Sequence, residues 1–262
     1  MSRETILRVQ DVTKTFGGIL ALNRLSFEVG RGEVLGIIGP NGSGKTTVVN
    51  CITGFVRMSS GKVFFKDKDI SGKPPHKIAD MGVTRTFQVM RPYYSLPAYK
   101  NLVIPLFSPR ARRTGGWRGG GKLGDRNTVG IDILEEIGFE RDSFVPYKMA
   151  STLPTGYLKR LELARCLALQ PEVILCDEVF SGLSMSEIAS MVPLIERIQM
   201  DGITVVMIEH RLRELFRVAN RVVVLNFGEK LMEGAPEEVM SDERVREAYF
   251  GSEEVEEVMT YA

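Results

Sequence analysis

The chain has 262 residues, of which 44% are hydrophobic and 26% charged, which is typical of a globular protein with one large domain or a core and a subdomain. Its formal net charge of +1 gives no electrostatic argument for nucleic acid as the main partner. No apolar run approaches the ~20 residues that span a bilayer, and the N-terminal residues lack the apolar stretch of a signal peptide, so we expect a cytoplasmic protein.

The hydrophobic pattern predicts strands and helices in alternation. In the first third, strands are expected at residues 6–9, 25–29, 34–38 and 63–65. From about Pro92, helix-length patterns follow at 98–106, 128–137 and 157–169. Strand patterns return at 173–176, 204–208 and 222–225. Strands separated by helices of this length favour a mainly parallel sheet covered by helices, with a helical insertion between two halves of an α/β core.

A glycine-rich turn separates the apolar strand at 34–38 from a helix predicted over 46–53. It consists of Gly39, Pro40, Asn41, Gly42, Ser43, Gly44, Lys45, Thr46 and Thr47, and its first eight residues fit the phosphate-binding pattern GxxxxGK followed by Ser or Thr. Backbone N–H groups and the helix N-terminus would surround phosphate oxygens. Lys45 would reach the β- and γ-phosphates, and the Thr46 hydroxyl would ligate Mg²⁺. We therefore expect a nucleoside triphosphate here; a turn that fits the pattern by accident is the alternative.

Two carboxylates, Asp177 and Glu178, follow the apolar strand at 173–176. Parallel sheets place their ligands at the C-terminal ends of strands. Asp177 suits Mg²⁺, through water, and Glu178 suits the polarisation of an attacking water as a general base. The alternative is a strand that ends in a capping Asp for the next helix.

His210 follows the strand at 204–208 and Glu209. An imidazole at this end of a core strand could hydrogen-bond a γ-phosphate, although a lone His is more often structural. A zinc site is not indicated, because the only other histidine, His76, lies in a Pro-rich turn. Cys51, Cys166 and Cys176 show no CxxC spacing and are expected to be small buried residues in a reducing compartment.

Residues 108–126 are rich in arginine and glycine. This composition is similar to that of RNA-binding tails, but a single short stretch without repeated aromatics favours a mobile surface loop. Contact between its charge and anionic lipid headgroups is a further hypothesis. The acidic residues at 253–257 are interpreted as a solvated helix face.

Taken together, these motifs resemble those of the ATP-binding subunits of ABC transporters. They occur in the family's order: Phe16 after the first strand, the turn at 39–47, Gln88, a signature-like turn before a helix, Asp177 with Glu178, a D-loop at 181–184, and His210. The resemblance implies that Phe16 stacks on adenine, that Gln88 contacts Mg²⁺ and senses the permease, and that His210 holds the γ-phosphate. It also implies a P-loop NTPase (RecA-like) α/β core with an N-terminal antiparallel β subdomain at 1–92 and 168–250, a helical subdomain at 93–167, and a tail at 251–262.

Shorter segments at 52–55, 84–88, 161–165, 208–210 and 245–251 resemble the LivG-type subunit of branched-chain amino acid importers. This implies an ATP-hydrolysing subunit that powers an importer, with importers of urea or short amides as the alternative. A soluble ABC ATPase acting on nucleic acid would carry long coiled-coil insertions or two cassettes, and the chain has neither. A non-hydrolysing regulatory subunit is disfavoured by Glu178.

The signature-like turn departs from the family's Leu-Ser-Gly-Gly-Gln, since it reads Leu153, Pro154, Thr155, Gly156 and Tyr157. In the family this turn caps the partner's nucleotide, and Pro154 supplies neither a hydroxyl nor an N–H. Thr155 could return a hydroxyl, and Tyr157 is expected to add bulk near the nucleotide. Ser184 and Val179 also replace the usual residues. These differences predict two unequal sites in a heterodimer with a second ABC ATPase subunit, although a homodimer is possible.

The remaining partners follow from the resemblance. They are transmembrane permease subunits and, indirectly, a solute-binding protein, which would place the chain peripherally on the inner face of the cell membrane. Residues 91–99 are the expected permease contact, with Tyr93 and Tyr94 as anchors. The alternative for these two tyrosines is packing within the helical subdomain.

Overall fold

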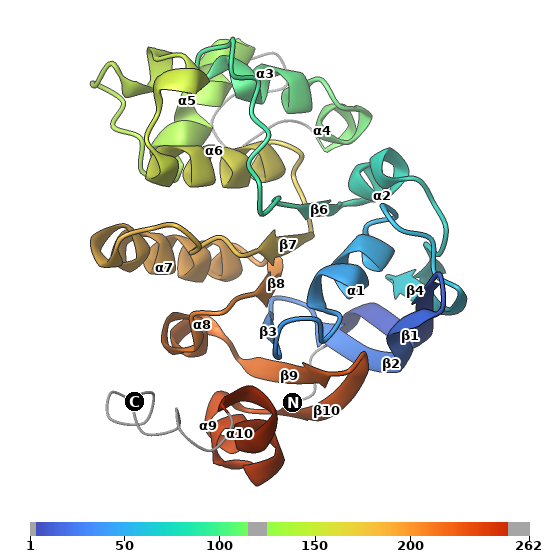
Figure 1. The fold of residues 1–262 in the computed structure, drawn as a ribbon. Helices are drawn as coiled ribbons and strands as arrows, with labels where there is room; N and C mark the ends of the chain where they lie inside the picture. Colours follow the sequence, from blue (N-terminus) through green and yellow to red (C-terminus); the bar gives the residue numbers. More distant parts are fainter. Residues whose placement is uncertain (1–3, 115–124, 251–262) are drawn as a thin grey trace. The chain divides into compact units, whose positions relative to one another are not determined.

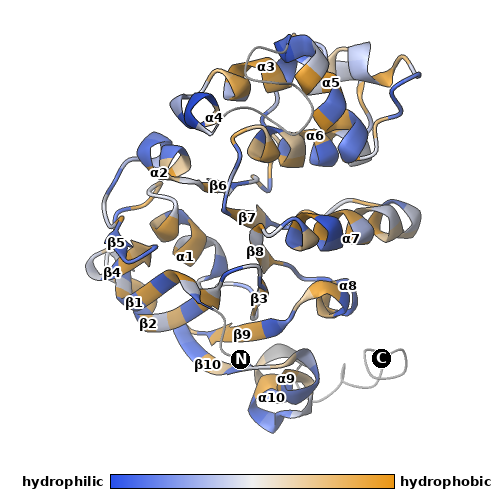
Figure 2. Ribbon diagram, turned by 180° about the vertical axis from the view of Figure 1, so that it is seen from behind, coloured by the Kyte–Doolittle hydropathy of each residue, from blue (hydrophilic) through white to orange (hydrophobic). Residues whose placement is uncertain are grey.

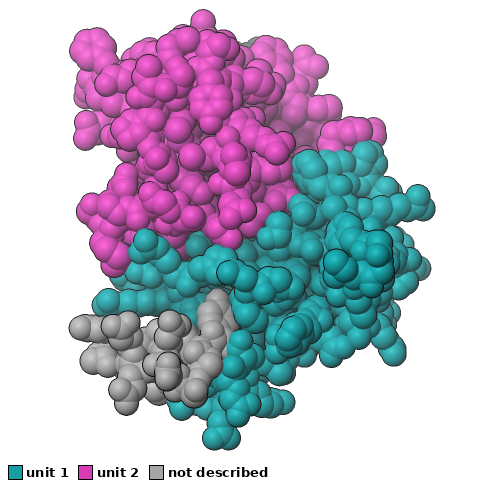
Figure 3. Space-filling view, viewed as in Figure 1, with its two compact units in different colours: residues 1–75, 195–262 teal, residues 76–194 magenta. Residues whose placement is uncertain are grey.

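The computed structural model describes residues 4–114 and 125–250 and divides the chain into two compact units, which Figure 3 distinguishes by colour. The first unit comprises residues 1–75 and 195–262, and the second comprises residues 76–194. Helix α7 (Met185–Met200) contributes residues to both. The second unit is thus a continuous stretch of chain inserted between the two parts of the first.

An antiparallel sheet forms part of the first unit. Its strand order is β2-β1-β4-β5, with β1 (Thr5–Phe16), β2 (Ile19–Gly30), β4 (Ser60–Phe65) and β5 (Lys68–Asp69). Gly17 and Gly18 close the β1–β2 hairpin as a two-residue turn, which leaves Phe16 beside the tip. Figure 2 shows both hydrophobic and hydrophilic segments along β1 and β2, and in β2 the buried residues Leu25, Phe27 and Val29 alternate with the more exposed Ser26 and Glu28.

A second set of strands in the first unit runs in the order β10-β9-β3-β8. The strands are β3 (Val34–Ile38), β8 (Thr204–Ile208), β9 (Arg221–Asn226) and β10 (Glu229–Gly234). β3 pairs in parallel with both β8 and β9, and β10 is antiparallel to β9. All residues of β3 and β8 are buried, as expected for parallel strands covered on both faces. The helices of this unit are α1 (Lys45–Ile52), α8 (Leu212–Val218), α9 (Pro236–Ser241) and α10 (Glu243–Phe250).

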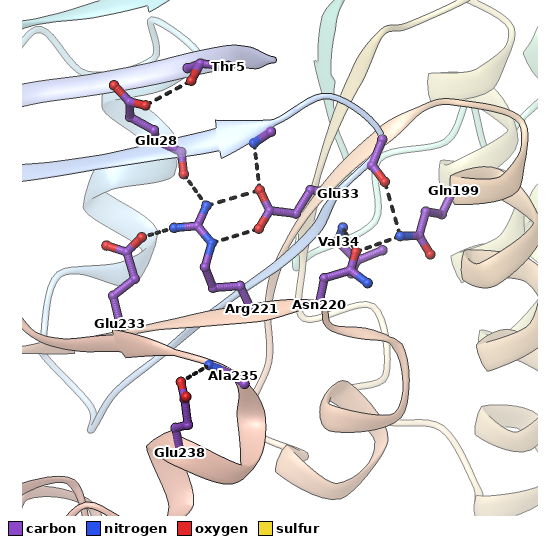
Figure 4. Close-up of polar contacts among 12 residues, drawn as sticks. Thr5, Glu28, Glu33, Val34, Gln199, Asn220, Arg221, Glu233, Ala235 and Glu238 are labelled. Carbon is purple, nitrogen blue, oxygen red and sulfur yellow. Dashed lines mark hydrogen bonds and ion pairs between the residues drawn. The ribbon is translucent and has the colours of Figure 1, made fainter. Parts of the chain in front are cut away.

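Arg221 at the start of β9 cross-links the strands of the first unit (Figure 4). Its guanidinium donates to both carboxylate oxygens of buried Glu33, at 2.8 and 3.1 Å, and to the backbone carbonyl of Glu28 on β2 at 2.7 Å. It also pairs with Glu233 on β10. These groups line an open cleft of about 720 Å³. Because carboxylates and carbonyls already engage this cation, we interpret the cluster as a structural clamp between the two sets of strands.

The second unit combines two parallel strands with a helical bundle. Strands β6 (Val83–Arg85) and β7 (Val173–Asp177) pair in parallel after α2 (Pro75–Met81). Helices α3 (Lys100–Leu106), α5 (Arg126–Glu136) and α6 (Thr155–Leu167) pack together, as Figure 1 shows. Two 3₁₀ turns, Val145–Tyr147 and Ala150–Thr152, precede α6.

The surface-loop prediction for residues 108–126 is wrong at its N-terminal end. Residues Pro109–Arg113 form helix α4, and the Arg110 guanidinium is nearly buried. It donates to the backbone carbonyls of Gln170 at 2.7 Å and Met81 at 2.8 Å, and it pairs with Glu172 at 3.2 Å. A guanidinium with three acceptors is a packing element of the second unit. Residues 115–124 and the acidic residues at 253–257 lie outside the described residues.

The three cysteines are buried, as expected, and they are free thiols. Burial raises the pKa of the Cys51 thiol to about 11 and that of Cys166 to about 12. Within residues 4–114 and 125–250, no helix is long and apolar enough to cross a bilayer.

Candidate functional site

The phosphate-binding pattern forms a tight loop between β3 and α1 in the first unit. Gly44 has a φ of +105°, and a Cβ added there would lie 2.7 Å from the backbone oxygen of Ala21, so the position requires glycine. Buried Lys45 donates from Nζ to the carbonyls of Gly39 at 2.6 Å and Pro40 at 2.9 Å. The lysine thus closes the loop on itself, and its ammonium is positioned at the centre of the loop.

Other groups of this loop suit an anionic ligand. The hydroxyl of Ser43 is buried and has no hydrogen-bond partner among the described residues. Thr46 is exposed in the first turn of α1, and that turn contains no acidic residue. A helix N-terminus that keeps its partial positive charge is favourable for phosphate. Asn41 and Gly42 are also exposed, and Thr47 is half-buried.

Phe16 and His210 also belong to the first unit. Phe16 ends β1 with 46% of its surface exposed, and the ammonium of Lys14 lies 4.6 Å from its ring centroid. An exposed ring beside a cation can stack on a base. His210 is exposed two residues after β8, next to buried Glu209. Their roles toward adenine and the γ-phosphate stay predictions.

In the second unit, Asp177 ends β7 and pairs with Arg85 of β6. The Arg85 Nη2 to Asp177 Oδ2 distance is 2.7 Å, and the two side chains are 7% and 2% exposed. The backbone N–H of Asp177 also donates to the hydroxyl of Thr86 at 3.1 Å. Burial raises the pKa of Asp177, and the charge of Arg85 acts in the opposite direction. The second carboxylate oxygen, Oδ1, is buried without a hydrogen-bond partner in the described part of the chain, so it could accept a ligand.

Glu178 and Gln88 meet in the same unit. The amide Nε2 of Gln88 donates to Oε2 of Glu178 at 2.8 Å, so the two residues that the sequence predicted for catalysis and metal contact are brought together. Glu178 has a φ of +51°, a left-handed conformation that costs a non-glycine residue about 1–2 kcal/mol. Lys159 of α6 donates to the carbonyl of Glu178 at 2.9 Å. The Glu178 backbone therefore adopts a strained conformation that Lys159 of α6 supports.

The signature-like turn forms the start of α6. Pro154 is its N-cap and makes no side-chain capping bond, as the missing hydroxyl predicts, while Thr155 is exposed. The Cβ position of Gly156 is filled by the carboxylate of Glu187. The ring of Tyr157 packs on Phe139 with centroids 4.9 Å apart. This contact corrects the expectation for Tyr157, because it directs the bulk of the ring into the helical bundle. Leu153 is buried.

The loop after Gln88 presents two half-exposed rings. Tyr93 and Tyr94 are 41% and 48% exposed. The fully buried Asn101 accepts from the N–H of Tyr93 at 2.7 Å and donates to the carbonyl of Pro97 at 3.0 Å. The guanidinium of Arg165 lies 5.2 Å from the Tyr93 ring centroid. The buried Asn101 thus holds the backbone of this loop, and the two tyrosine rings stay half-exposed.

Sequence reasoning did not identify Arg85, Lys159 or Asn101. Lys159 and Asn101 are buried polar residues, and the side chain of Arg85 is 7% exposed, so polar residues within largely apolar segments were the available signal. Their partners could not be inferred, since Arg85 and Asp177 are 92 residues apart in the chain.

Comparison with protein families gives two matches. Residues 22–181 match the family described as ABC transporter, and residues 229–255 match the family described as branched-chain amino acid ATP-binding cassette transporter. The first covers more than half of the chain and contains the phosphate loop, Gln88, the signature-like turn and Asp177–Glu178. The second covers β10 and the helices after it.

Curated relatives align over almost the whole chain. The high-affinity branched-chain amino acid transport ATP-binding protein LivG of Salmonella typhimurium is 34% identical over 95% of this chain and 98% of its own length. BraF of Pseudomonas aeruginosa, which has the same description, is 34% identical over 96% and 99%. A probable LivG of Archaeoglobus fulgidus is 32% identical over 96% and 97%.

Solved structures give the same family. A nucleotide-free ATP-binding cassette from an ABC transporter has a TM-score of 0.81 and 31% identity, covering 95% of this chain and all of that one. The ADP conformation of an ABC transporter cassette has a TM-score of 0.81 and 32% identity, covering 95% and 99%. The fold is therefore the mixed α/β fold of ABC ATPases, as the sequence predicted.

Proposed function

This chain belongs to the ABC transporter family of ATP-hydrolysing, ATP-binding subunits, and from that premise we propose that it powers an importer of branched-chain amino acids. The observation that carries the substrate class is the match of residues 229–255 to the branched-chain cassette family, together with 34% identity to LivG along 95% of the chain. An importer of urea or short amides is the alternative that the family resemblance leaves open.

ATP is bound first by the loop between β3 and α1. Lys45 exchanges its two carbonyl acceptors, Gly39 and Pro40, for phosphate oxygens, which are stronger acceptors because they are charged. The N-terminal N–H groups of α1 and the hydroxyl of Ser43 complete the contacts. Phe16 stacks on adenine.

The donor set fits Mg²⁺. Asp177 offers a buried carboxylate oxygen without a partner among the described residues, and Thr46 offers an exposed hydroxyl. Mg²⁺ is usually bound by one or two protein ligands together with substrate phosphates and water. Asp177 and Gln88 of the second unit would hold the ion, which would neutralise charge on the β- and γ-phosphates when bound.

Glu178 accepts the proton of the attacking water. Gln88 orients its carboxylate through the 2.8 Å hydrogen bond, and Lys45 withdraws charge from the phosphates. His210 donates to the γ-phosphate as the leaving oxygen separates. Glu178→Gln preserves the shape of the side chain but removes the base, so it should abolish turnover and retain ATP binding.

The second nucleotide of the dimer is capped by residues 153–157 of this chain. Pro154 at the N-cap of α6 supplies neither an N–H nor a hydroxyl, whereas Thr155 is an exposed residue that carries a hydroxyl. A heterodimer would therefore have one strong site, built on Lys45 and Glu178, and one weak site. Glu178→Gln should remove most of the hydrolysis, whereas changing the partner's corresponding Glu should remove little. Equal losses would contradict the asymmetry.

Permease subunits dock on residues 91–99, which would hold the chain on the inner face of the membrane. The hydrogen bonds of Asn101 hold the backbone of this loop in place, so Tyr93 and Tyr94 are preorganised anchors. Alanine at both tyrosines should abolish co-purification with the permeases and leave basal ATP binding intact. Met200→Ala, at a position 84% exposed in the first unit, is the matched control and should co-purify normally.

Transport itself tests the substrate class. Proteoliposomes that hold the assembled transporter and its solute-binding protein should accumulate labelled leucine on addition of ATP, and should not do so when the chain carries Glu178→Gln. Accumulation of urea or acetamide with no leucine uptake would assign the alternative substrate.

A further inference from the structure

Lys159 is a nearly buried cation in the second turn of α6, with 5% of its surface exposed. Its ammonium donates to the backbone carbonyl of Glu178 at 2.9 Å and to that of Gln88 at 3.4 Å. These two residues are also joined to each other by their side chains at 2.8 Å. One ammonium thus connects the backbones at both ends of the hydrogen bond that orients the catalytic carboxylate.

This arrangement supports a backbone conformation that is unfavourable by itself. Glu178 has a φ of +51°, and its carbonyl accepts from the N–H of Ser181 at 3.2 Å as well as from Lys159. Strained residues persist where surrounding contacts over-determine them. A buried ammonium, in turn, requires polar partners, and the two carbonyls supply them. Lys159 and the strained segment therefore stabilise each other.

The same helix begins with the signature-like turn. Lys159 lies four residues after Thr155, so the two residues share one face of α6. The start of the helix makes a second contact with the same segment, because the carboxylate of Glu187 packs at the Cβ position of Gly156. That carboxylate also accepts hydrogen bonds from the N–H and the hydroxyl of Ser184. Helix α6 is thus attached at two points to the segment that runs from Glu178 to Glu187.

We propose that Lys159 is a positioning residue that connects the signature-like turn, which caps the partner's nucleotide, to the carbonyls of Glu178 and Gln88, which belong to this chain's own hydrolytic site. The proposal rests on the proposed function, because it assigns the turn and the carboxylate to two different nucleotides. When the partner's nucleotide contacts the N-terminus of α6 and displaces the helix, the hydrogen bond from Lys159 displaces the backbone of Glu178 as well. Lys159 itself contacts neither nucleotide.

The test compares three variants of the full chain. Lys159→Met keeps the length of the side chain and removes its charge and its hydrogen-bond donors. Lys159→Arg keeps the charge and the donors. Arg160→Met is the matched control, because Arg160 is the next residue of α6 and also donates to a carbonyl, that of Ile137 at 2.8 Å, and to Ser190 at 2.6 Å. Circular dichroism melts establish that each variant folds, and Lys159→Gln replaces Lys159→Met if the latter does not.

Hydrogen exchange of the chain alone is the first readout. Lys159→Met should accelerate exchange in peptides that cover 86–92 and 176–184, and Arg160→Met should accelerate it only around 137–140 and 188–192. Unchanged exchange at 86–92 and 176–184 in Lys159→Met would overturn the proposal. This readout does not depend on turnover, so it decides about Lys159 even if the chain hydrolyses no ATP and the proposed function fails.

Turnover of the assembled transporter is the second readout. Lys159→Met should lower kcat for ATP by about 100-fold, the cost of a misplaced catalytic group, with KM within about 3-fold of wild type because Lys45 and its loop are untouched. Lys159→Arg should restore most of kcat, and Arg160→Met should retain it. A rise in KM at constant kcat, or an equal loss of kcat in Arg160→Met, would contradict a positioning role.

Discussion

Replacing Arg85 by methionine tests the buried ion pair that holds Asp177. The pair has an Nη2 to Oδ2 distance of 2.7 Å, and both side chains are less than a tenth exposed. Removing one partner of such a pair leaves an uncompensated buried charge, which costs about 3–5 kcal/mol. For a chain of this size, that corresponds to a fall in Tm of roughly 6–20 °C. Arg85→Met should therefore be among the most destabilising single changes in the second unit.

Urea unfolding without nucleotide, followed by far-ultraviolet circular dichroism, measures the loss in the free energy of unfolding caused by Arg85→Met. Asp177→Asn should be destabilising for the same reason, and the double variant should be less destabilised than the sum of the two by about 2–3 kcal/mol. Arg141→Met is the matched control, because Arg141 pairs with Asp132 at the same 2.7 Å but is 46% exposed, so its replacement should lower the free energy of unfolding far less than Arg85→Met does. Additive costs of Arg85→Met and Asp177→Asn, or equal costs at Arg85 and Arg141, would refute the reasoning.

Four further predictions concern single residues. Ser184→Ala removes the capping group of α7 and should lower the free energy of unfolding by about 1 kcal/mol in the same assay. Gly44→Ala should abolish binding of a fluorescent ATP analogue because of its φ of +105° and the crowded Cβ position, whereas Gly202→Ala, which also has positive φ but open space, should bind normally. Burial raises the pKa of Cys51 and Cys166 to about 11 and about 12, so both thiols should resist iodoacetamide at pH 8 until the chain is unfolded. Because their folded pKa values lie above the unfolded value near 9, stability is fully present below pH 9 and should be lost as pH rises toward 11; constant stability over that range would contradict the assignment.

The fully buried strands were predicted well. The expected bounds 34–38 and 204–208 coincide with β3 and β8, because parallel strands covered on both faces are continuous apolar runs. β1 and β2 were predicted too short, since half-exposed antiparallel strands depend on alternation, and register shifts interrupt it here. Helix α4 was missed because its arginines look solvent-exposed in sequence, whereas Arg110 is held by carbonyls far along the chain.

Some residues of the candidate site could likewise be predicted from the sequence, and others could not. The phosphate loop could be predicted because its chemistry lies within nine consecutive residues. Gln88 and Glu178 were each singled out by the family resemblance, but the hydrogen bond that joins them was not predicted. Lys159 and Arg85 could not be predicted as structural partners of this site. Their acceptors lie 19 and 92 residues away, and only the packing of helices and strands brings them together.

The central claim is that this chain supplies all the hydrolytic residues of one site, which becomes active only when a partner's signature turn caps the nucleotide. The most direct test is the rate of ATP turnover by the purified chain alone and in the assembled transporter with its second cassette and permeases, with Glu178→Gln as the control. The account predicts turnover that appears only in the assembly and is largely lost with Glu178→Gln. Rapid turnover by the chain alone would mean that residues 153–157 form a competent signature, and it would contradict the account.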